Sequence, residues 1–448
     1  MKFIRKYFSF AILSISLLFL LYTFYQSEVN FAKDRRYEYN QYYYISILLI
    51  FFSIISFFIN KKIKEYLIIS TISFVFVMYL FEAYLIYKKI SENKVTILYE
   101  KQTSKKWDIR TKYEIYENLK KNNIKISLPV NPFFFINNNQ IFPLANHSNS
   151  EIIHCNENGY YSITGTDRFG FNNPDEEWDR KNIEYLLVGD SFTMGSCVNR
   201  PNDIGSVLRK LSNKSVLNLG NGGNGPIVEY ATLREYLNPN VKNVIWLYSE
   251  ANDLIDITHE KKNKILMNYL NDLNFSQNLK SRQKEINILI SNMIVQRKKD
   301  IEKSYSEKLK SNKLLKFKHS QLVRFVKLSN LRLKFLPKTT TLKPIAEFKQ
   351  SLMLAKDLVN TNNSRLYFVY MPEFYRYKTN YNNTNYKLVK NIVKNLNIPF
   401  IDIHKELLEK ENKPLALFPF GDIGNSNRHY NIEGYKKISN TIFKLTDN

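Results

Sequence analysis

One apolar run in this chain ends in residues that could carry nucleophilic chemistry. Residues 185–188 (Tyr-Leu-Leu-Val) break abruptly into Gly189, Asp190 and Ser191, as expected where a buried strand passes into a helix. A helix that begins at Ser191 would aim its free backbone N–H groups and the positive end of its dipole at an oxyanion formed beside the hydroxyl. An Asp-Ser pair is also an ordinary helix N-cap, so this segment needs support from the rest of the chain.

Three later segments supply that support. Residues 215–219 run into the glycine loop 220–225, residues 244–248 are followed by Asn252, and His429 stands just before a helix-like tail near the C-terminus. A serine hydroxyl needs a base with a pKa near neutrality to attack an ester carbonyl, and histidine suits that role. Fixed donors on the resulting oxyanion are worth about 3 kcal/mol each. The four segments together predict acyl transfer.

The order of a Gly-Asp-Ser block, a glycine loop, an asparagine and a histidine resembles the SGNH (GDSL-type) hydrolase superfamily, over residues 181–448. The resemblance implies that Ser191 is the nucleophile and His429 the general base. It also implies an oxyanion hole made by Ser191, the backbone N–H of Gly223 and the side-chain amide of Asn252. The implied activity is that of a serine esterase or O-acyltransferase working through an acyl-serine, with no cofactor and no metal.

Two positions depart from the family pattern. Ser426 stands where the family usually has an aspartate three residues before the histidine, and Glu250 stands where it usually has a glycine. Asp422 or a backbone carbonyl could still orient the imidazole; otherwise the site is a Ser-His dyad. Because loss of the orienting carboxylate can lower turnover by up to ~10⁴, an alternative is a catalytically inactive glycan-binding or scaffold component of an envelope polysaccharide assembly.

The glycine loop permits a second reading. Residues 220–225 also satisfy G-x-G-x-x-G after a strand, and Glu250 lies roughly where a dinucleotide-binding fold has its acidic residue. This reading leaves Ser191 and His429 unexplained, so we favour the hydrolase. Binding of a nicotinamide cofactor would reverse that preference.

The pattern of alternating strands and helices predicts how these residues are positioned. The expected strands cover residues 184–188, 215–219, 243–248, 365–371 and 398–403. With the resemblance, they give an α/β fold, a three-layer α/β/α flavodoxin-like (SGNH hydrolase) domain with a five-stranded parallel sheet. Ser191, Gly223 and Asn252 follow the carboxyl ends of strands, where such a sheet has its ligand crevice.

The first 90 residues differ from the rest of the chain. Residues 7–25, 42–59 and 66–87 are apolar runs of spanning length, so we expect a membrane anchor over 1–90 with three transmembrane helices. The basic residues favour a cytoplasmic N-terminus and an extracytoplasmic catalytic domain at a bacterial inner (plasma) membrane. They are Lys2, Arg5, Lys6, Lys61, Lys62 and Lys64. Glu82 lies near the end of the third run, from which we expect it to reach the interface.

Residues 91–180 are expected to form a connecting region at the edge of the catalytic domain, with a helix over 107–119 and a hairpin over 159–171. Arg168 in that hairpin is a candidate for binding an acidic substrate group. Cys155 and Cys197 are the two cysteines, and no spacing rule decides whether they form a disulfide.

A basic insert over about 256–343 separates the third and fourth strands. It could form a lid, lie on anionic lipid headgroups, or be a solvated helical pair. The net charge of +24, next to three membrane spans and no recognisable nucleic-acid module, favours a lipid bilayer and an acylated glycan or lipid as partners over nucleic acid. The sequence does not define an oligomeric state.

Overall fold

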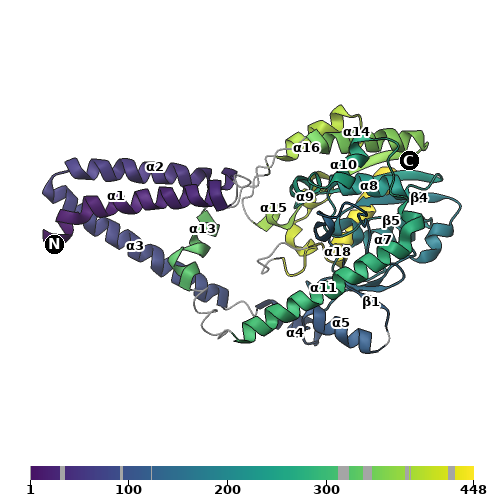
Figure 1. The fold of residues 1–448 in the computed structure, drawn as a ribbon, viewed down its shortest axis with the longest axis horizontal. Coiled ribbons are helices and arrows are strands. Elements are labelled where there is room, and N and C mark those ends of the chain that lie inside the picture. Colours follow the sequence, from purple (N-terminus) through teal and green to yellow (C-terminus); the bar gives the residue numbers. More distant parts are fainter. Residues whose placement is uncertain are drawn as a thin grey trace. The chain divides into compact units, whose positions relative to one another are not determined.

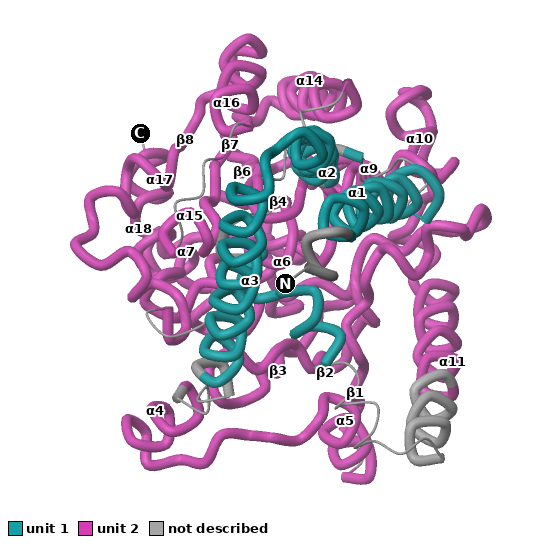
Figure 2. The backbone as a smooth tube through the Cα atoms, turned by 90° about the vertical axis from the view of Figure 1, so that its left-hand side faces the viewer, with its two compact units in different colours: residues 1–92, 308–341 teal, residues 93–307, 342–448 magenta. Residues whose placement is uncertain are grey.

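The computed structural model divides the chain into two compact units, coloured separately in Figure 2. Unit 1 contains residues 1–92 and 308–341, and unit 2 contains residues 93–307 and 342–448. The structure describes residues 2–30, 36–90, 94–122, 124–310, 322–335, 346–378, 383, 385–421 and 429–447. Each unit is described by itself.

Unit 1 is built on the three expected apolar helices. They are α1 (Lys2–Phe24, continued as a π-helix over Tyr25–Asn30), α2 (Arg36–Phe58) and α3 (Lys61–Ile90). All three are long and apolar enough to cross a membrane. Small polar residues join α1 to α2: the Ser16 and Ser53 hydroxyls are 3.2 Å apart, and the Ser9 hydroxyl donates to the Ser56 carbonyl at 3.1 Å. Such residues let helix backbones approach closely within a membrane.

The end of the basic insert belongs to unit 1. Helix α13 (Ser329–Phe335) begins at the carboxylate of Glu82 on α3, which accepts hydrogen bonds from the backbone and side-chain nitrogens of Asn330 and from the backbone of Leu331 at 2.8–3.0 Å. Glu82 is fully buried. The side chain therefore satisfies the first N–H groups of a helix, instead of extending to the interface as we expected from the sequence.

Unit 2 contains the predicted five-stranded parallel sheet. The strands are β4 (Ile183–Gly189), β5 (Val216–Asn218), β6 (Val241–Ser249), β7 (Arg365–Met371) and β8 (Phe400–Asp402). Their order is β5-β4-β6-β7-β8 and every pairing is parallel. With the strands numbered along the chain this is the 2-1-3-4-5 order of flavodoxin-like folds. The α/β fold class predicted from the sequence is confirmed.

Helices cover both faces of this sheet (Figure 1). On one face lie α8 (Pro226–Tyr236), α14 (Ala346–Thr361) and α16 (Asn385–Asn395), in the core cluster that contains Leu186 and Val188 of β4. On the other, α7 (Ile204–Ser212) and α18 (Ile432–Thr446) pack over Tyr185 and Leu187. Successive strand residues point to opposite faces, so both faces of β4 are apolar, as expected for a strand covered by helices on both sides.

The remaining elements of unit 2 surround the sheet. They are α4 (Lys94–Thr103), α5 (Lys112–Lys121), β1 (Ile126–Ser127), β2 (Glu151–Ile153), β3 (Ile163–Gly165), α6 (Ser191–Met194), α9 (Asp253–Glu260), α10 (Lys264–Asn271), α11 (Gln283–Lys310), α15 (Phe374–Lys378) and α17 (Ile403–Glu406), with short 3-10 turns between them.

Two details of the connecting region differ from the sequence prediction. The expected hairpin over 159–171 is wrong, because β3 pairs antiparallel with the upstream strand β2 and not with residues that follow it. The helix predicted over 107–119 begins only at Lys112, because Thr111 and Glu114 form a capping box there. Residues 93–180 fold together with the sheet as part of unit 2.

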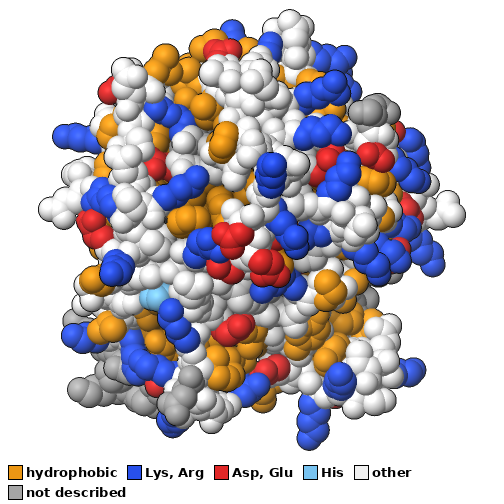
Figure 3. Space-filling view, turned by 90° about the vertical axis from the view of Figure 1, so that its right-hand side faces the viewer, with side chains coloured by type: hydrophobic (Ala, Val, Ile, Leu, Met, Phe, Trp, Pro, Cys, Tyr) orange, Lys and Arg blue, Asp and Glu red, His pale blue; other side chains and the backbone are white. Residues whose placement is uncertain are grey.

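Figure 3 shows how charged side chains are distributed over one face of the molecule. On the face drawn in Figure 3, Lys and Arg side chains are scattered, with Asp and Glu among them, and form no continuous basic stripe. Part of this charge is paired, since Glu184 binds both Lys214 and Lys242 at 2.8–2.9 Å. This face therefore lacks the basic stripe that marks a nucleic-acid-binding surface.

Candidate active site

Ser191 stands at the carboxyl end of β4, at the first position of the short helix α6. Asp190 caps this helix by accepting a hydrogen bond from the backbone N–H of Phe192 at 2.8 Å. Gly189 allows the turn, because a Cβ there would lie 2.6 Å from the carbonyl oxygen of Leu247. Asp190 is fully buried, and burial raises the pKa of its carboxyl group. The turn thus presents the serine hydroxyl at the edge of the sheet.

His429 reaches this hydroxyl from the other end of the domain. Its Nε2 lies 2.9 Å from the Oγ of Ser191. It is placed just before α18, whose cap Asn431 accepts from the backbone of Gly434, and its ring lies 4.7 Å from that of Phe192 between centroids. The expected serine and histidine are therefore in hydrogen-bond contact.

Glu157 holds the opposite side of the imidazole. Its Oε1 lies 3.1 Å from His429 Nδ1, and its Oε2 accepts from the backbone N–H of His429 at 2.8 Å. A proton on Nδ1 that donates to Glu157 leaves Nε2 free to accept the serine proton. Glu157 thus occupies the place for which we considered Asp422. Asp422 and Ser426 lie outside the described residues.

Sequence reasoning missed Glu157 because it lies 272 positions before His429, in the connecting region and outside the stretch that resembles the family. One signal could have found it. Cys155, two positions earlier, forms a disulfide with Cys197 in the loop after Ser191, with a Cα–Cα distance of 5.0 Å. A disulfide between these cysteines necessarily carries the Glu157 segment to the nucleophile.

The disulfide also bears on metal binding. Ligand atoms of Cys155, Glu157, Cys197 and His429 lie within 4.8 Å of one another. Metals bind cysteine as the thiolate, and both sulfurs here are engaged in the disulfide. The cluster is therefore a poor metal donor set in its oxidised form.

Gly223 and Asn252, the expected oxyanion donors besides Ser191, belong to the glycine loop and to the segment after β6. The glycine loop passes close to the serine, since a Cβ on Gly222 would lie 3.8 Å from the Cβ of Ser191, and Gly223 adopts a left-handed φ of +85° that favours glycine. Asn252 follows β6, where its Oδ1 accepts from the Ser249 hydroxyl at 2.8 Å and its Nδ2 donates to Asp256 at 2.6 Å. These bonds orient the Asn252 amide, which also interacts with the buried carboxyl group of Asp190.

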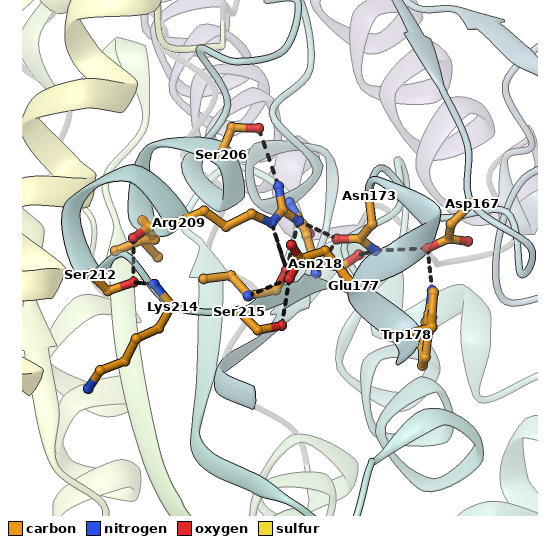
Figure 4. A network of polar contacts seen from close by, with 12 residues as sticks. Asp167, Asn173, Glu177, Trp178, Ser206, Arg209, Ser212, Lys214, Ser215 and Asn218 are labelled. Atoms are coloured by element: carbon orange, nitrogen blue, oxygen red, sulfur yellow. Dashed lines mark hydrogen bonds and ion pairs between the residues drawn. The ribbon is translucent and has the colours of Figure 1, made fainter. Parts of the chain in front are cut away.

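A buried polar network fixes the loops that carry these groups (Figure 4). Asn218, at the end of β5, accepts from the backbone of Gly220 at 2.9 Å and donates to the carbonyl of Thr193 in α6 at 2.7 Å. The backbone N–H of Asn218 donates to Asn173, which Arg209 also binds at 2.7 Å. The glycine loop and the serine helix are therefore held by one side chain.

Other sequence candidates are used elsewhere. Arg168 forms ion pairs with Asp175 and Asp179 at 2.8 and 2.6 Å and does not line the cavity beside the serine. Glu250 accepts from the backbone of Glu373 and pairs with the Arg376 guanidinium. Glu250 is therefore used in an ion pair and is not an acidic residue left free to bind a ribose.

The glycine loop is also not free to bind a pyrophosphate at the start of α8. The carboxylate of Glu260 accepts hydrogen bonds from the backbone N–H groups of Gly225 and Ile227 at 2.6 and 2.9 Å. Burial raises the pKa of Glu260 to about 7. Because a dinucleotide needs those same N–H groups, the alternative reading of residues 220–225 loses its anion site.

Together these features define a flavodoxin-like α/β domain that carries a hydrogen-bonded Ser-His-Glu arrangement at the carboxyl edge of its sheet, the constellation used for acyl transfer. A scan against protein-family models and a search of curated proteins find no match. One similar solved structure is described as a lipolytic protein of the G-D-S-L family from Desulfitobacterium hafniense DCB-2. It is 14% identical, covers 59% of this chain and 99% of its own, and has a TM-score of 0.31. This likeness is too low to support a functional argument.

Proposed function

We propose that the chain is a membrane-anchored serine esterase or O-acyltransferase that acts on acyl esters of cell-envelope glycans or lipids. The contact between Ser191 Oγ and His429 Nε2 at 2.9 Å carries the proposal. Glu157, which orients the imidazole, supports it.

The proposed reaction has two steps. His429 Nε2 takes the proton of Ser191 as Oγ attacks the ester carbonyl, and the negative charge on the former carbonyl oxygen faces the backbone N–H groups of Ser191 and Gly223 and the amide of Asn252. The imidazolium then gives its proton to the departing alcohol, which leaves an acyl-serine. Water or a sugar hydroxyl, deprotonated by His429, next attacks the acyl-serine and releases Ser191. Glu157, hydrogen-bonded to Nδ1, stabilises the imidazolium in both steps.

The proposed location is the extracytoplasmic side of a bacterial inner membrane. Three helices of unit 1 are apolar enough to cross a bilayer, and basic residues in the first turns of α1 and α3 favour a cytoplasmic N-terminus. The Cys155–Cys197 disulfide supports this side of the membrane, because disulfides persist in oxidising compartments and are rare in the cytosol. Envelope glycans and lipids are the acylated molecules found there.

The alternative of an inactive glycan-binding scaffold is less well supported. It was motivated by Ser426 in the position of the family's aspartate, and Glu157 now supplies a carboxylate to the imidazole. We retain it as an outcome of the test below.

The test uses the full chain in detergent micelles with para-nitrophenyl acetate. We expect hydrolysis that Ser191→Ala abolishes and that the control Ser212→Ala, at the C-terminal end of α7, leaves unchanged. To distinguish transfer from hydrolysis, an oligosaccharide is added and two rates are compared. Acyl groups that reach the sugar faster than free acid is released indicate a transferase. Equal rates for wild type and Ser191→Ala would exclude the assignment, and specific polysaccharide binding without turnover would favour the scaffold.

A further inference from the structure

A cavity of about 420 Å³ is lined in part by Met194, Ser196 and Gly222, close neighbours of the candidate nucleophile. Its volume is within the usual size range of small-molecule sites, ~300–1,000 Å³. Most of its wall is apolar. The apolar lining residues are Leu128, Pro129, Val130, Phe134, Met194, Met293 and Ile294. A methyl group would use only a small part of this volume, so the cavity suits a chain of several carbons.

The cavity adjoins the segments that carry the candidate site. Gly222 and Met194 both line it; Gly222 passes next to Ser191, and Met194 ends the helix that Ser191 begins. Cys155, whose disulfide brings Glu157 to His429, is also part of the wall. The cavity is therefore lined by residues that flank the Ser191 turn and the glycine loop, within reach of an ester bound at Ser191.

Two positively charged side chains also line the cavity. Lys112, at the first position of α5, and Arg297, on α11, are both half-buried, and neither forms an ion pair within the part of the chain that the structure describes. The neighbouring Lys298, by contrast, binds Glu117 at 2.7 Å. Burial, followed by the positive charge of Arg297, lowers the pKa of Lys112.

Aromatic packing positions one of these cations. The Arg297 guanidinium lies 3.8 Å from the centroid of the Phe134 ring, and Phe134 itself lines the cavity. Such packing holds a guanidinium without neutralising it. Placing two like charges together in a partly desolvated wall is unfavourable, and an anion between them would reverse the sign of that interaction.

Building on the proposed function, we propose that the substrate is an anionic amphiphilic ester. Its apolar segment of several carbons occupies this cavity, and its carboxylate or phosphate group binds Lys112 and Arg297. The two cations thereby act as specificity residues that favour negatively charged esters over neutral ones of the same length.

The first experiment compares two esters with the same leaving group, para-nitrophenyl valerate and the mono-para-nitrophenyl ester of glutaric acid. They differ in a terminal methyl or carboxylate. We expect the double variant Lys112→Gln/Arg297→Gln to lower kcat/KM for the glutarate ester by about tenfold or more, as for loss of a charged hydrogen bond, and to leave the valerate ester within about twofold. Lys121→Gln, an exposed lysine on the same helix, is the matched control, and Lys112→Arg/Arg297→Lys should retain the preference.

Equal losses for both esters, or no change for either, would overturn the proposal. A second measurement separates it from the proposed function. Calorimetry with Ser191→Ala should show hexanoate or hexyl phosphate binding more tightly than hexanol, with that preference lost when Lys112 and Arg297 become Gln. Anion-selective binding without ester cleavage would contradict only the proposed catalytic activity. Cleavage without charge discrimination would contradict only the proposed binding of an anionic substrate in the cavity. If hexanoate binds more tightly than hexyl phosphate, the anionic group of the substrate is a carboxylate. If hexyl phosphate binds more tightly, that group is a phosphate.

Discussion

Glu157 holds His429 with both of its carboxylate oxygens, one on the ring Nδ1 at 3.1 Å and one on the backbone N–H at 2.8 Å. A single side chain thus fixes the tautomer of the imidazole and the position of the segment that carries it. Because the other ring nitrogen faces Ser191, the orientation of Glu157 determines whether the serine can be deprotonated.

Replacing this carboxylate tests its role. Glu157→Gln keeps the size of the side chain but loses the charge that stabilises the imidazolium and one acceptor for His429. We expect kcat for a para-nitrophenyl ester to fall by ~10²–10⁴ with KM little changed. The control is Glu409→Gln, which removes an equal charge from an exposed ion pair with Lys405. Equal turnover in Glu157→Gln and wild type would show that the carboxylate is dispensable.

The disulfide should support turnover as well as stability. Cys155→Ser/Cys197→Ser opens a loop of 42 residues, which lowers the free energy of unfolding by roughly 4 kcal/mol in the chain-entropy model. The segment that carries Glu157 then loses its covalent tie to the loop after Ser191, so kcat should fall even at temperatures where the protein remains folded. Steady-state kinetics and thermal unfolding of the same samples check both effects. If the variant is less stable but its kcat is unchanged, the disulfide is not needed to position Glu157.

Asn252 is expected to act on the transition state. In Asn252→Ala the amide donor is removed, and loss of one oxyanion donor lowers kcat by ~10²–10³ with a small effect on KM. Asn240→Ala, an exposed asparagine before β6, serves as the control and should behave as wild type. A raised KM with normal kcat would instead assign Asn252 to substrate binding.

Stability should depend on pH through His154. This residue is fully buried, and desolvation, followed by the charges of Lys112 and His429, lowers its pKa to about 3. Below the unfolded-state value of about 6.5 the unfolded chain binds a proton that the folded chain does not, so folding weakens as pH falls, by up to ~1.4 kcal/mol per unit. His154→Gln removes this term.

The measurement is the difference in Tm between wild type and His154→Gln as a function of pH. Relative to its value near pH 7.5, this difference should shift in favour of the variant as the pH falls from about 6.5 towards 4.5. The buried carboxyl groups are common to both proteins, so their contribution to the pH dependence of Tm cancels in this difference. A pH-independent difference would mean that His154 takes up its proton in the folded state.

Much of the fold could be predicted because its signals are local. The runs that became β4, β6 and β7 are apolar, bounded by turns and placed within two residues of their observed ends. Ser191, Gly223 and Asn252 follow from the same signals, because each stands just past the end of a strand. Their approach to one edge of the sheet is a consequence of parallel pairing.

The rest depends on contacts between distant segments. Glu157 has no local pattern that marks it as a partner of His429, and β3 pairs with a strand upstream of the turns that suggested a hairpin. The composition of helix α13 marks it only as part of a basic insert. Its first backbone N–H groups donate to the carboxylate of Glu82, and this contact depends on the fold of unit 1. The hydrophobic periodicity of a sequence indicates which residues are buried, but it does not identify the partner of a buried polar group.

The most direct test of the central claim is the reaction of the full-length protein with a fluorophosphonate, followed by mass spectrometry of the peptide that contains Ser191. The Ser-His-Glu arrangement predicts one covalent adduct on Ser191, formed rapidly in wild type and at least ~10²-fold more slowly in His429→Ala. An unmodified Ser191, or equal labelling rates with and without His429, would contradict it.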